Sequence, residues 1–194
     1  GRPGLQLRRL GGAVGPGGAP GHGRVGDVAA GVVGGGILVV AQKIVSKAEG
    51  RIVRLSEITP SPRALELARE LGQEPRPTEL GLRESKLVVR TAPGVLITET
   101  KHGLICANPG VDLSNAPGED LAVLLPLDPD ASAERIRAAL GAERAVIISD
   151  TFGRPWREGQ TNIAIGVAGL LPLNSYVGQT DTHGYELRVT SICV

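Results

Sequence analysis

Residues 1–36 are so rich in glycine that a regular fold has to be built from the rest of the chain. Half of the 28 glycines of the chain fall in this segment, and Asp27 is the only acidic residue before Glu49. Glycine loses much conformational freedom on folding and offers no side chain to bury. A phosphate-binding glycine loop is the functional alternative, but no GxxxxGK[ST] pattern and no preceding strand accompany these glycines. We therefore expect an irregular or mis-specified segment over residues 1–34 and a folded domain over residues 35–194.

The composition of the chain excludes several classes of protein. Charge is nearly balanced, with 21 Lys and Arg against 20 Asp and Glu, which argues against a general nucleic-acid binder. Aromatic residues make up 2%, too few for base-stacking platforms. Two cysteines do not make a disulfide framework, and no apolar run approaches the roughly 20 residues that span a bilayer. We expect a cytoplasmic protein with neither nucleic acid nor membrane as its partner.

Two segments carry the start and stop signals of helices. In TPSPRALELARELG, Ser61 can cap the first turn, Pro62 suits that turn and Gly72 can end the helix. A second capped helix in DPDASAERIRAALG ends at Gly141, and TELGLRESK predicts a shorter one between the two. The apolar spacing predicts inward faces made of Ala64, Leu67, Ala68 and Leu71 in the first helix and Ala133, Ile136 and Leu140 in the last.

Short apolar runs predict strands around these helices. The runs are ILVV at residues 37–40, LVVR, VLITET, LICAN, AVIIS and the final TSICV. The residues Lys101-His102-Gly103 predict a hairpin turn between VLITET and LICAN, so His102 is expected to be a turn residue. Cys106 lies in an apolar run and is expected to be a core residue.

A group of acidic, hydroxyl and cationic side chains comes after AVIIS, in the segment SDTFGRPWREGQTNIAIG. Asp150 and Thr151 come at the carboxyl end of a strand, where ligand sites of open α/β sheets occur. Arg154 and Arg157 offer planar cations to phosphate or carboxylate, and Asp112 could reach the same ion from the loop NPGVDLSNAPGED. That loop equally suits simple turn formation. From the residues alone, the pattern favours a metal- and phosphate-handling enzyme.

Four long motifs in order resemble the coenzyme F420-0:γ-glutamyl ligase family. They are VVAQKIVSKAEGR, LITETKHGLICANPGVDLSN, LPLDPDASAERIR and SDTFGRPWREGQTNIAIGVAG, and the resemblance runs from about Ile37 to Val194. It implies a family-specific α+β fold with mixed sheets and a homodimer. The strand and glycine turn with which the family begins are not seen in residues 1–34, and the family continues beyond the last residue here. We therefore expect that fold to be incomplete at both ends.

The resemblance also implies an activity and a set of site residues. The activity is GTP-dependent ligation of L-glutamate to coenzyme F420-0, with extension of a γ-linked tail, through an acyl phosphate and with Mg²⁺ or Mn²⁺. Asp112, Asp150 and Thr151 match the metal positions of the family. Positions that contact the nucleotide are matched by Gln42, Lys43, Lys47 and Asn115. Arg154 and Arg157 are our own assignment, as contacts to an anionic substrate.

Two other classes of function stay open. The chain could be an inactive fragment that retains nucleotide or deazaflavin binding, or another metal-dependent phosphoryl-transfer enzyme such as a phosphatase. A phosphatase turns over without glutamate, whereas a ligase needs glutamate for coupled turnover.

Overall fold

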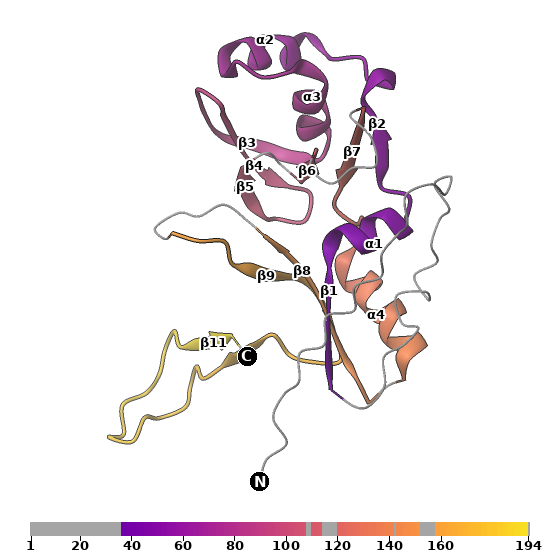
Figure 1. The fold of residues 1–194 in the computed structure, drawn as a ribbon. Coiled ribbons are helices and arrows are strands. Elements are labelled where there is room, and N and C mark those ends of the chain that lie inside the picture. Colours follow the sequence, from indigo (N-terminus) through magenta and orange to yellow (C-terminus); the bar gives the residue numbers. More distant parts are fainter. Residues whose placement is uncertain (1–35, 108–109, 114–119, 142, 152–157, 194) are drawn as a thin grey trace.

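The chain folds as a mixture of helices and several small sheets, an α+β architecture (Figure 1). The computed structural model describes residues 36–107, 110–113, 120–141, 143–151 and 158–193. The segment 1–34, for which we expected irregular structure, lies outside this description. The elements are β1 (Ile37–Ala41), α1 (Gln42–Ala48), β2 (Ile52–Arg54), the 3-10 turn η2 (Leu55–Glu57), α2 (Pro62–Leu71), α3 (Pro75–Arg83), β3 (Ser85–Ala92), β4 (Val95–Thr100), β5 (Ile105–Ala107), β6 (Val111–Asp112), β7 (Leu121–Leu124), α4 (Pro129–Leu140), β8 (Ala145–Thr151), β9 (Asn162–Ala168), β10 (Leu173–Ser175) and β11 (Ser191–Cys193).

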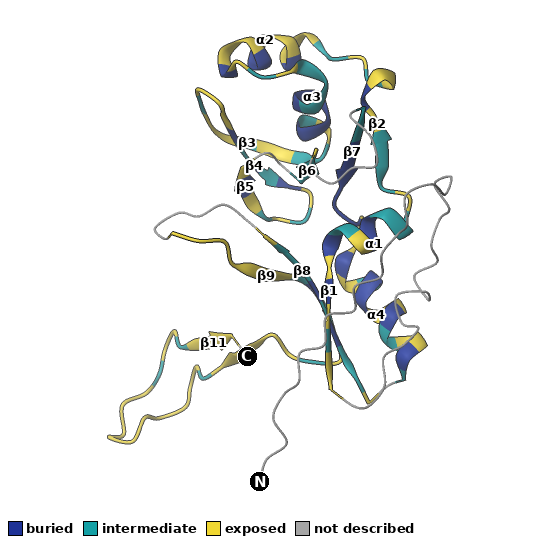
Figure 2. Ribbon diagram, in the orientation of Figure 1, coloured by how far each residue is buried: buried dark blue, intermediate teal, exposed yellow. Residues whose placement is uncertain are grey.

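The sheet β1-β8-β9 forms the lower part of the body and carries the largest core. Strands β1 and β8 run parallel, whereas β8 and β9 are antiparallel. Helix α4 packs on one face of this sheet, and the shared core consists of Val40, Val45, Ala133, Ile136, Leu140, Val146, Ile148 and Ala168 (Figure 2). Alternate residues of β1 face the other way, since Ile37 and Val39 are exposed while Val40 is buried.

Two further three-stranded sheets and helices α2 and α3 form the upper part of the body (Figure 1). The sheet β2-β7-β6 packs around Leu55, Leu80 and Ala122, and the sheet β3-β4-β5 contributes Leu96 to a cluster with Leu67 and Leu71. The chain passes from the lower to the upper part after α1 and returns at the end of β7. Helix α1 and strand β7 therefore join the two parts.

The start and stop signals of α2 and α4 are confirmed, whereas the helix expected in TELGLRESK begins earlier, at Pro75, and ends at Arg83. The Ser61 hydroxyl accepts a hydrogen bond from the amide of Ala64 at 3.2 Å, and Gly72 ends α2 with φ at 65°. Asp128 caps α4 in the same way, through the amide of Ala131 at 2.9 Å. The predicted inward residues of both helices are buried. These outcomes follow from local chemistry, because a cap needs only its own first turn.

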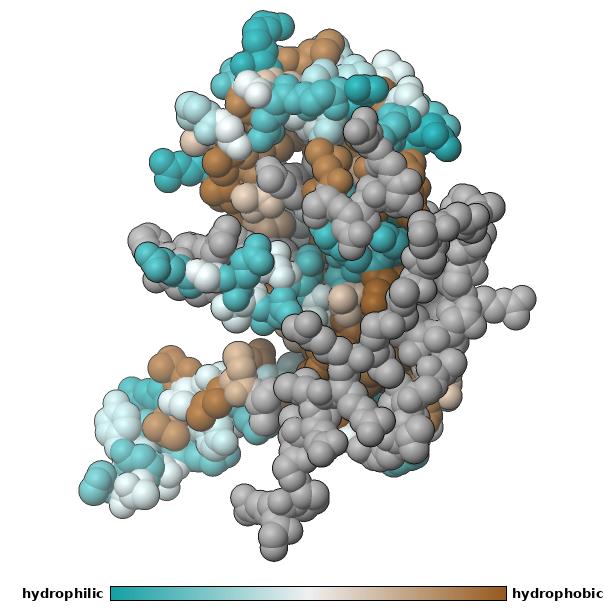
Figure 3. Space-filling model, viewed as in Figure 1, coloured by the Kyte–Doolittle hydropathy of each residue, from teal (hydrophilic) through white to brown (hydrophobic). Residues whose placement is uncertain are grey.

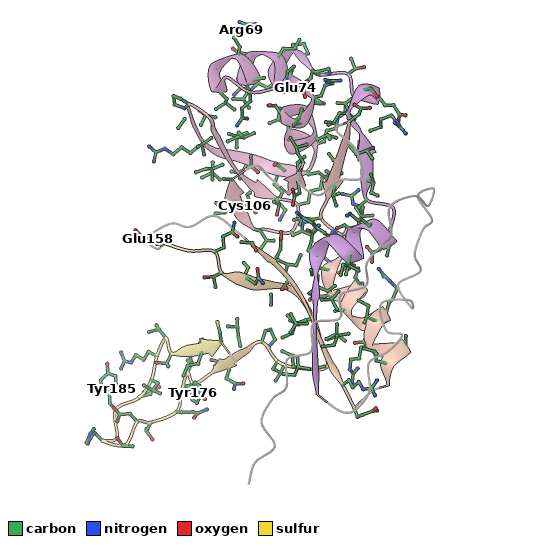
Figure 4. The ribbon with its side chains drawn as sticks, in the orientation of Figure 1. Arg69, Glu74, Cys106, Glu158, Tyr176 and Tyr185 are labelled. Atoms are coloured by element: carbon green, nitrogen blue, oxygen red, sulfur yellow. The ribbon has the colours of Figure 1, made fainter. Side chains whose placement is uncertain are left out.

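The hairpin β10-β11 projects from the lower part of the body (Figures 1 and 2). Its strands and the loop between them are mostly exposed, including Tyr185 at 68% and Val189 at 89%. Both labelled tyrosines, Tyr176 and Tyr185, lie on this hairpin, away from the body (Figure 4). Within the described residues, no helix is both long and apolar enough to cross a membrane.

Candidate functional site

The parallel pairing of β1 with β8 brings two chain segments to one edge of the lower sheet. Ala41, the last residue of β1, lies opposite Ser149 in the register. The residues that follow these two partners therefore lie side by side. They are Gln42 and Lys43 after Ala41, and Asp150 and Thr151 after Ser149. This edge holds the carboxyl ends of both parallel strands, the location at which open α/β sheets bind ligands.

Strand β6 brings Asp112 to the same place from the upper part of the body. Asp112 pairs with Val123 of β7, so the expectation that it lies in a loop is wrong: backbone pairing with β7 holds it in a two-residue strand. The Gln42 amide donates to the carbonyl of Leu124 at 3.3 Å and to the hydroxyl of Ser46 at 2.6 Å. Gln42 is only 3% exposed, and its bonds tie the start of α1 to the end of β7.

Lys43 and Asp112 form an ion pair at the centre of the site. The Lys43 Nζ lies 2.6 Å from Asp112 Oδ2, and the two side chains are 27% and 33% exposed. The pair is therefore partly open to solvent. Lys43 is in the first turn of α1 directly after β1, so the strand pairing described above positions the cation as well as the acid.

Asp150 lies close enough to this pair to respond to both charges. Burial raises the pKa of the Asp150 carboxyl above its ordinary value, and the negative charge of Asp112 acts in the same direction. The backbone amide of Thr151 and the ammonium of Lys43 act against the rise. The structure therefore brings Asp112, Asp150 and Lys43 together from three elements that are distant in sequence.

Thr151 contacts the neighbouring strand. Its hydroxyl donates to Asn162 Oδ1 at 2.5 Å, and the two residues are paired in the β8-β9 register. A hydroxyl that donates to a side-chain carbonyl keeps its own oxygen lone pairs available for another contact. Asn162 was not among the predicted site residues, because only the antiparallel pairing of β8 with β9 places it beside Thr151.

Cys106 lies at the lower end of the sheet β3-β4-β5 (Figure 4). It is 6% exposed, which confirms it as a core residue. Burial raises the pKa of its thiol and the charge of Asp150 raises it further, while a hydrogen bond from the backbone of Gly110 opposes the rise. A thiol held in its protonated form is a poor nucleophile, so this environment does not activate it for catalysis.

His102 is confirmed as a turn residue, and its Nε2 donates to the carbonyl of Pro126 at 2.7 Å.

The donors at this edge fit a hard divalent cation. Asp112 and Asp150 offer carboxylates, and Thr151 carries a hydroxyl one residue further along β8. Oxygen atoms are the ligands preferred by Mg²⁺. Among the described residues, no three His, Cys, Asp or Glu side chains gather closely enough to form a complete protein cage. Mg²⁺ is typically held by one or two carboxylates, with waters and phosphate oxygens completing its shell.

The remaining predicted residues divide into two groups. Lys47 is described and lies in the last turn of α1, one turn beyond Lys43. Asn115, Arg154 and Arg157 lie outside the described residues, so their placement stays a prediction. The ion pair between Lys43 and Asp112 was missed, since the sequence suggested a nucleotide contact for Lys43 and a metal contact for Asp112. No local signal links residues that meet through strand pairing.

Comparison with known proteins points in one direction. Residues 25–194 match the family model described as F420-0:Gamma-glutamyl ligase. The chain is 48% identical over 164 residues to the coenzyme F420:L-glutamate ligase of Methanothermobacter thermautotrophicus, covering 82% of this chain and 65% of the relative. The proteins of the same name from Methanopyrus kandleri and Halobacterium salinarum are 45% and 44% identical, covering 82% and 80% of this chain and 65% and 63% of the relatives. The chain thus spans just under two thirds of the length of these relatives.

Proposed function

Because the chain belongs to the F420-0:gamma-glutamyl ligase family, we propose that it acts in the ligation of L-glutamate to coenzyme F420-0. In this proposal GTP supplies the energy, Mg²⁺ or Mn²⁺ is the metal, and further glutamates extend a γ-linked tail. The relatives are named coenzyme F420:L-glutamate ligase, and this name supports coenzyme F420-0 and L-glutamate as the two substrates in the proposal. GTP, the metal and the tail extension come from the resemblance of the motifs.

One observation carries the proposal for the site. The carboxyl ends of two parallel strands bring Lys43 and Asp150 to the edge at which Asp112 enters from β6. Two carboxylates beside a lysine suit a site that handles phosphate. The carboxylates can hold a metal ion, and the lysine can pair with a phosphate oxygen. We therefore assign Asp112, Asp150 and Thr151 to the metal and Gln42, Lys43, Lys47 and Asn115 to the nucleotide. Arg154 and Arg157 are assigned to an anionic substrate.

The proposed chemistry has two steps. A carboxylate oxygen of coenzyme F420-0 attacks the γ-phosphorus of GTP, which forms an acyl phosphate and releases GDP. The amine of glutamate then attacks the acyl carbon, so an amide bond forms, phosphate leaves and the amine loses a proton. A divalent cation bound at this site would neutralise the charge that builds on the transferred phosphate. Lys43 and Lys47 would add point charges near the phosphates, and Asp112 and Asp150 would hold the cation.

Substitution of Asp150 by Asn tests the proposal. Asp150→Asn keeps the shape of the side chain and removes its charge, so glutamate addition should fall by at least a hundredfold, the scale on which loss of one electrostatic partner acts in an active site. The matched control is Glu134→Gln on α4, whose carboxylate is 58% exposed and pairs with Arg137 on the same helix. The product, coenzyme F420-0 with added glutamate, is measured by mass spectrometry.

The same assay separates the alternatives. GTP turnover that depends on both glutamate and coenzyme F420-0 supports the ligase. Release of phosphate without glutamate indicates a phosphatase-type enzyme, and nucleotide binding without turnover indicates an inactive fragment. Near-normal product formation by Asp150→Asn would remove Asp150 from the site.

A homodimer is the second part of the proposal. Exposed apolar side chains on the projecting hairpin support it, since Val177, Tyr185, Val189 and Ile192 face solvent in the single chain and a partner chain would bury them (Figure 3). Light scattering on the purified chain measures its mass. Val189→Asp on the hairpin should shift a dimer toward monomer, and a wild-type monomer at micromolar concentration would contradict the proposal.

We also retain the reducing cytoplasm as the setting, in which both cysteines keep free thiols.

A further inference from the structure

The ammonium of Lys43 contacts a carboxylate that the proposed function assigns to the metal. It is 2.6 Å from Asp112 Oδ2, one of the carboxylate oxygens assigned to the metal. An ammonium and a divalent cation on the same carboxylate repel each other, because both are positive and close together. Each therefore weakens the hold of Asp112 on the other, and the two compete for it.

A second ion pair, between Arg51 and Glu84, is more enclosed than the pair of Lys43 with Asp112. Arg51 and Glu84 have side chains that are 17% and 13% exposed, and Arg51 Nε also donates to the carbonyl of Leu125 at 2.8 Å. The Lys43–Asp112 pair is more open, with side chains 27% and 33% exposed. Lysine is also a point charge on a flexible stem, whereas arginine is a planar fork that fits its partners from one direction. Of these two pairs, the lysine pair is therefore the better suited to exchange.

Movement of Lys43 away from Asp112 takes one positive charge away from the two carboxylates of the site. The negative charge of Asp112 and the positive charge of Lys43 both act on Asp150, in opposite directions. A divalent cation brings twice the charge of the ammonium, so it can replace Lys43 and still hold both acids together. The released ammonium, in the first turn of α1 at the same sheet edge, then meets an incoming anion.

We propose that Lys43 and the divalent cation are alternative partners of Asp112, so that cation binding releases Lys43 to a phosphate group. This inference rests on the metal site of the proposed function. It assigns Lys43 a role in coupling: the metal and the phosphate each favour the arrangement that the other needs. Binding of one ligand therefore strengthens binding of the other by the same factor.

The test measures binding of Mn²⁺ to the full chain by electron paramagnetic resonance, without nucleotide. Lys43→Met removes the competing charge and roughly keeps the length of the side chain. Mn²⁺ should then bind roughly fivefold to tenfold more tightly, between the effect of an exposed ion pair and that of a hydrogen bond to a charged group. Lys43→Gln should change the affinity in the same direction. The control is Lys101→Met, since Lys101 is 54% exposed and pairs with Glu84 at 3.5 Å. Circular dichroism shows that each variant is folded.

A second measurement examines the coupling. Binding of a non-hydrolysable GTP analogue is titrated with and without saturating Mn²⁺, and the strengthening by Mn²⁺ should be at least threefold greater in the wild type than in Lys43→Met. Unchanged or weaker Mn²⁺ binding in both Lys43 variants, with Asp112→Asn losing the metal, would overturn the exchange and leave the metal site intact. Absence of Mn²⁺ binding in every variant would instead overturn the metal site of the proposed function, and the exchange with it.

Discussion

Gly166 in β9 is a position where one added methyl group should disturb the fold. A Cβ built there would lie 2.4 Å from both the carbonyl carbon and the oxygen of Pro129, the first residue of α4. The next residue of β9, Val167, donates its amide to the carboxylate of Asp130 at 2.8 Å. The strand and the start of the helix are therefore in direct contact, and the nearest obstacle on the helix is backbone rather than the end of a flexible side chain.

The size and the sign of the effect of Gly166→Ala follow from these distances. To move from 2.4 Å to an ordinary contact of 3.4 Å, the helix and the strand must separate by about 1 Å. Overpacking of this kind costs about 1–3 kcal/mol, and the upper half of that range applies because the obstacle is backbone. Without the clash, the same substitution would stabilise a strand by about 0.5–1 kcal/mol, since alanine is less flexible than glycine. The sign of the change therefore separates the two cases.

Urea unfolding and calorimetry of the two proteins measure this difference. A loss of about 2–3 kcal/mol should lower the midpoint of thermal unfolding by roughly 4–12 °C in a chain of this size. The control is Ala164→Val on the same strand, at an exposed position where added methyl groups meet solvent and should change stability by less than about 0.5 kcal/mol. Wild-type or higher stability of Gly166→Ala would refute the close packing of α4 on β9.

Two further predictions concern ionisable groups. Burial acts to raise the pKa of Glu79, but hydrogen bonds from Ser61 and Arg83 outweigh it and hold the pKa below its usual value. The ionised Glu79 therefore stabilises the fold above the unfolded-state pKa of about 4.3, and this contribution is lost as the pH falls through the lower folded-state pKa. In urea unfolding, the difference in stability between wild type and Glu79→Gln should be largest near pH 7 and shrink toward pH 3. A difference that stays constant with pH would contradict this prediction. Cys193 is exposed and Cys106 is buried with a raised pKa, so a thiol reagent at pH 8 should label Cys193 fast and Cys106 only on unfolding; equal rates measured by mass spectrometry would show that the site edge opens to solvent.

The sequence alone determined those features that depend on neighbours along the chain. Ser61 and Gly72 mark the ends of α2 because a cap and a left-handed terminal glycine act within one turn. The buried faces of α2 and α4 follow from apolar spacing, and the hairpin turn at His102 follows from the residues of the turn itself. The motifs that identify the family are also continuous segments, so they could be recognised without a fold.

Only the tertiary structure decided which of these segments meet. Lys43, Asp112 and Asp150 belong to α1, β6 and β8, and they are joined by the parallel register of β1 with β8 and the pairing of β6 with β7. The sequence placed Asp112 in a loop, because a two-residue strand has no pattern of its own and exists only through its partner. The ion pair of Lys43 with Asp112 has the same origin. Strand pairing joins residues that are far apart along the chain. Burial in the shared core of β1, β8 and α4 selects the first pairing, and burial around Leu55, Leu80 and Ala122 selects the second.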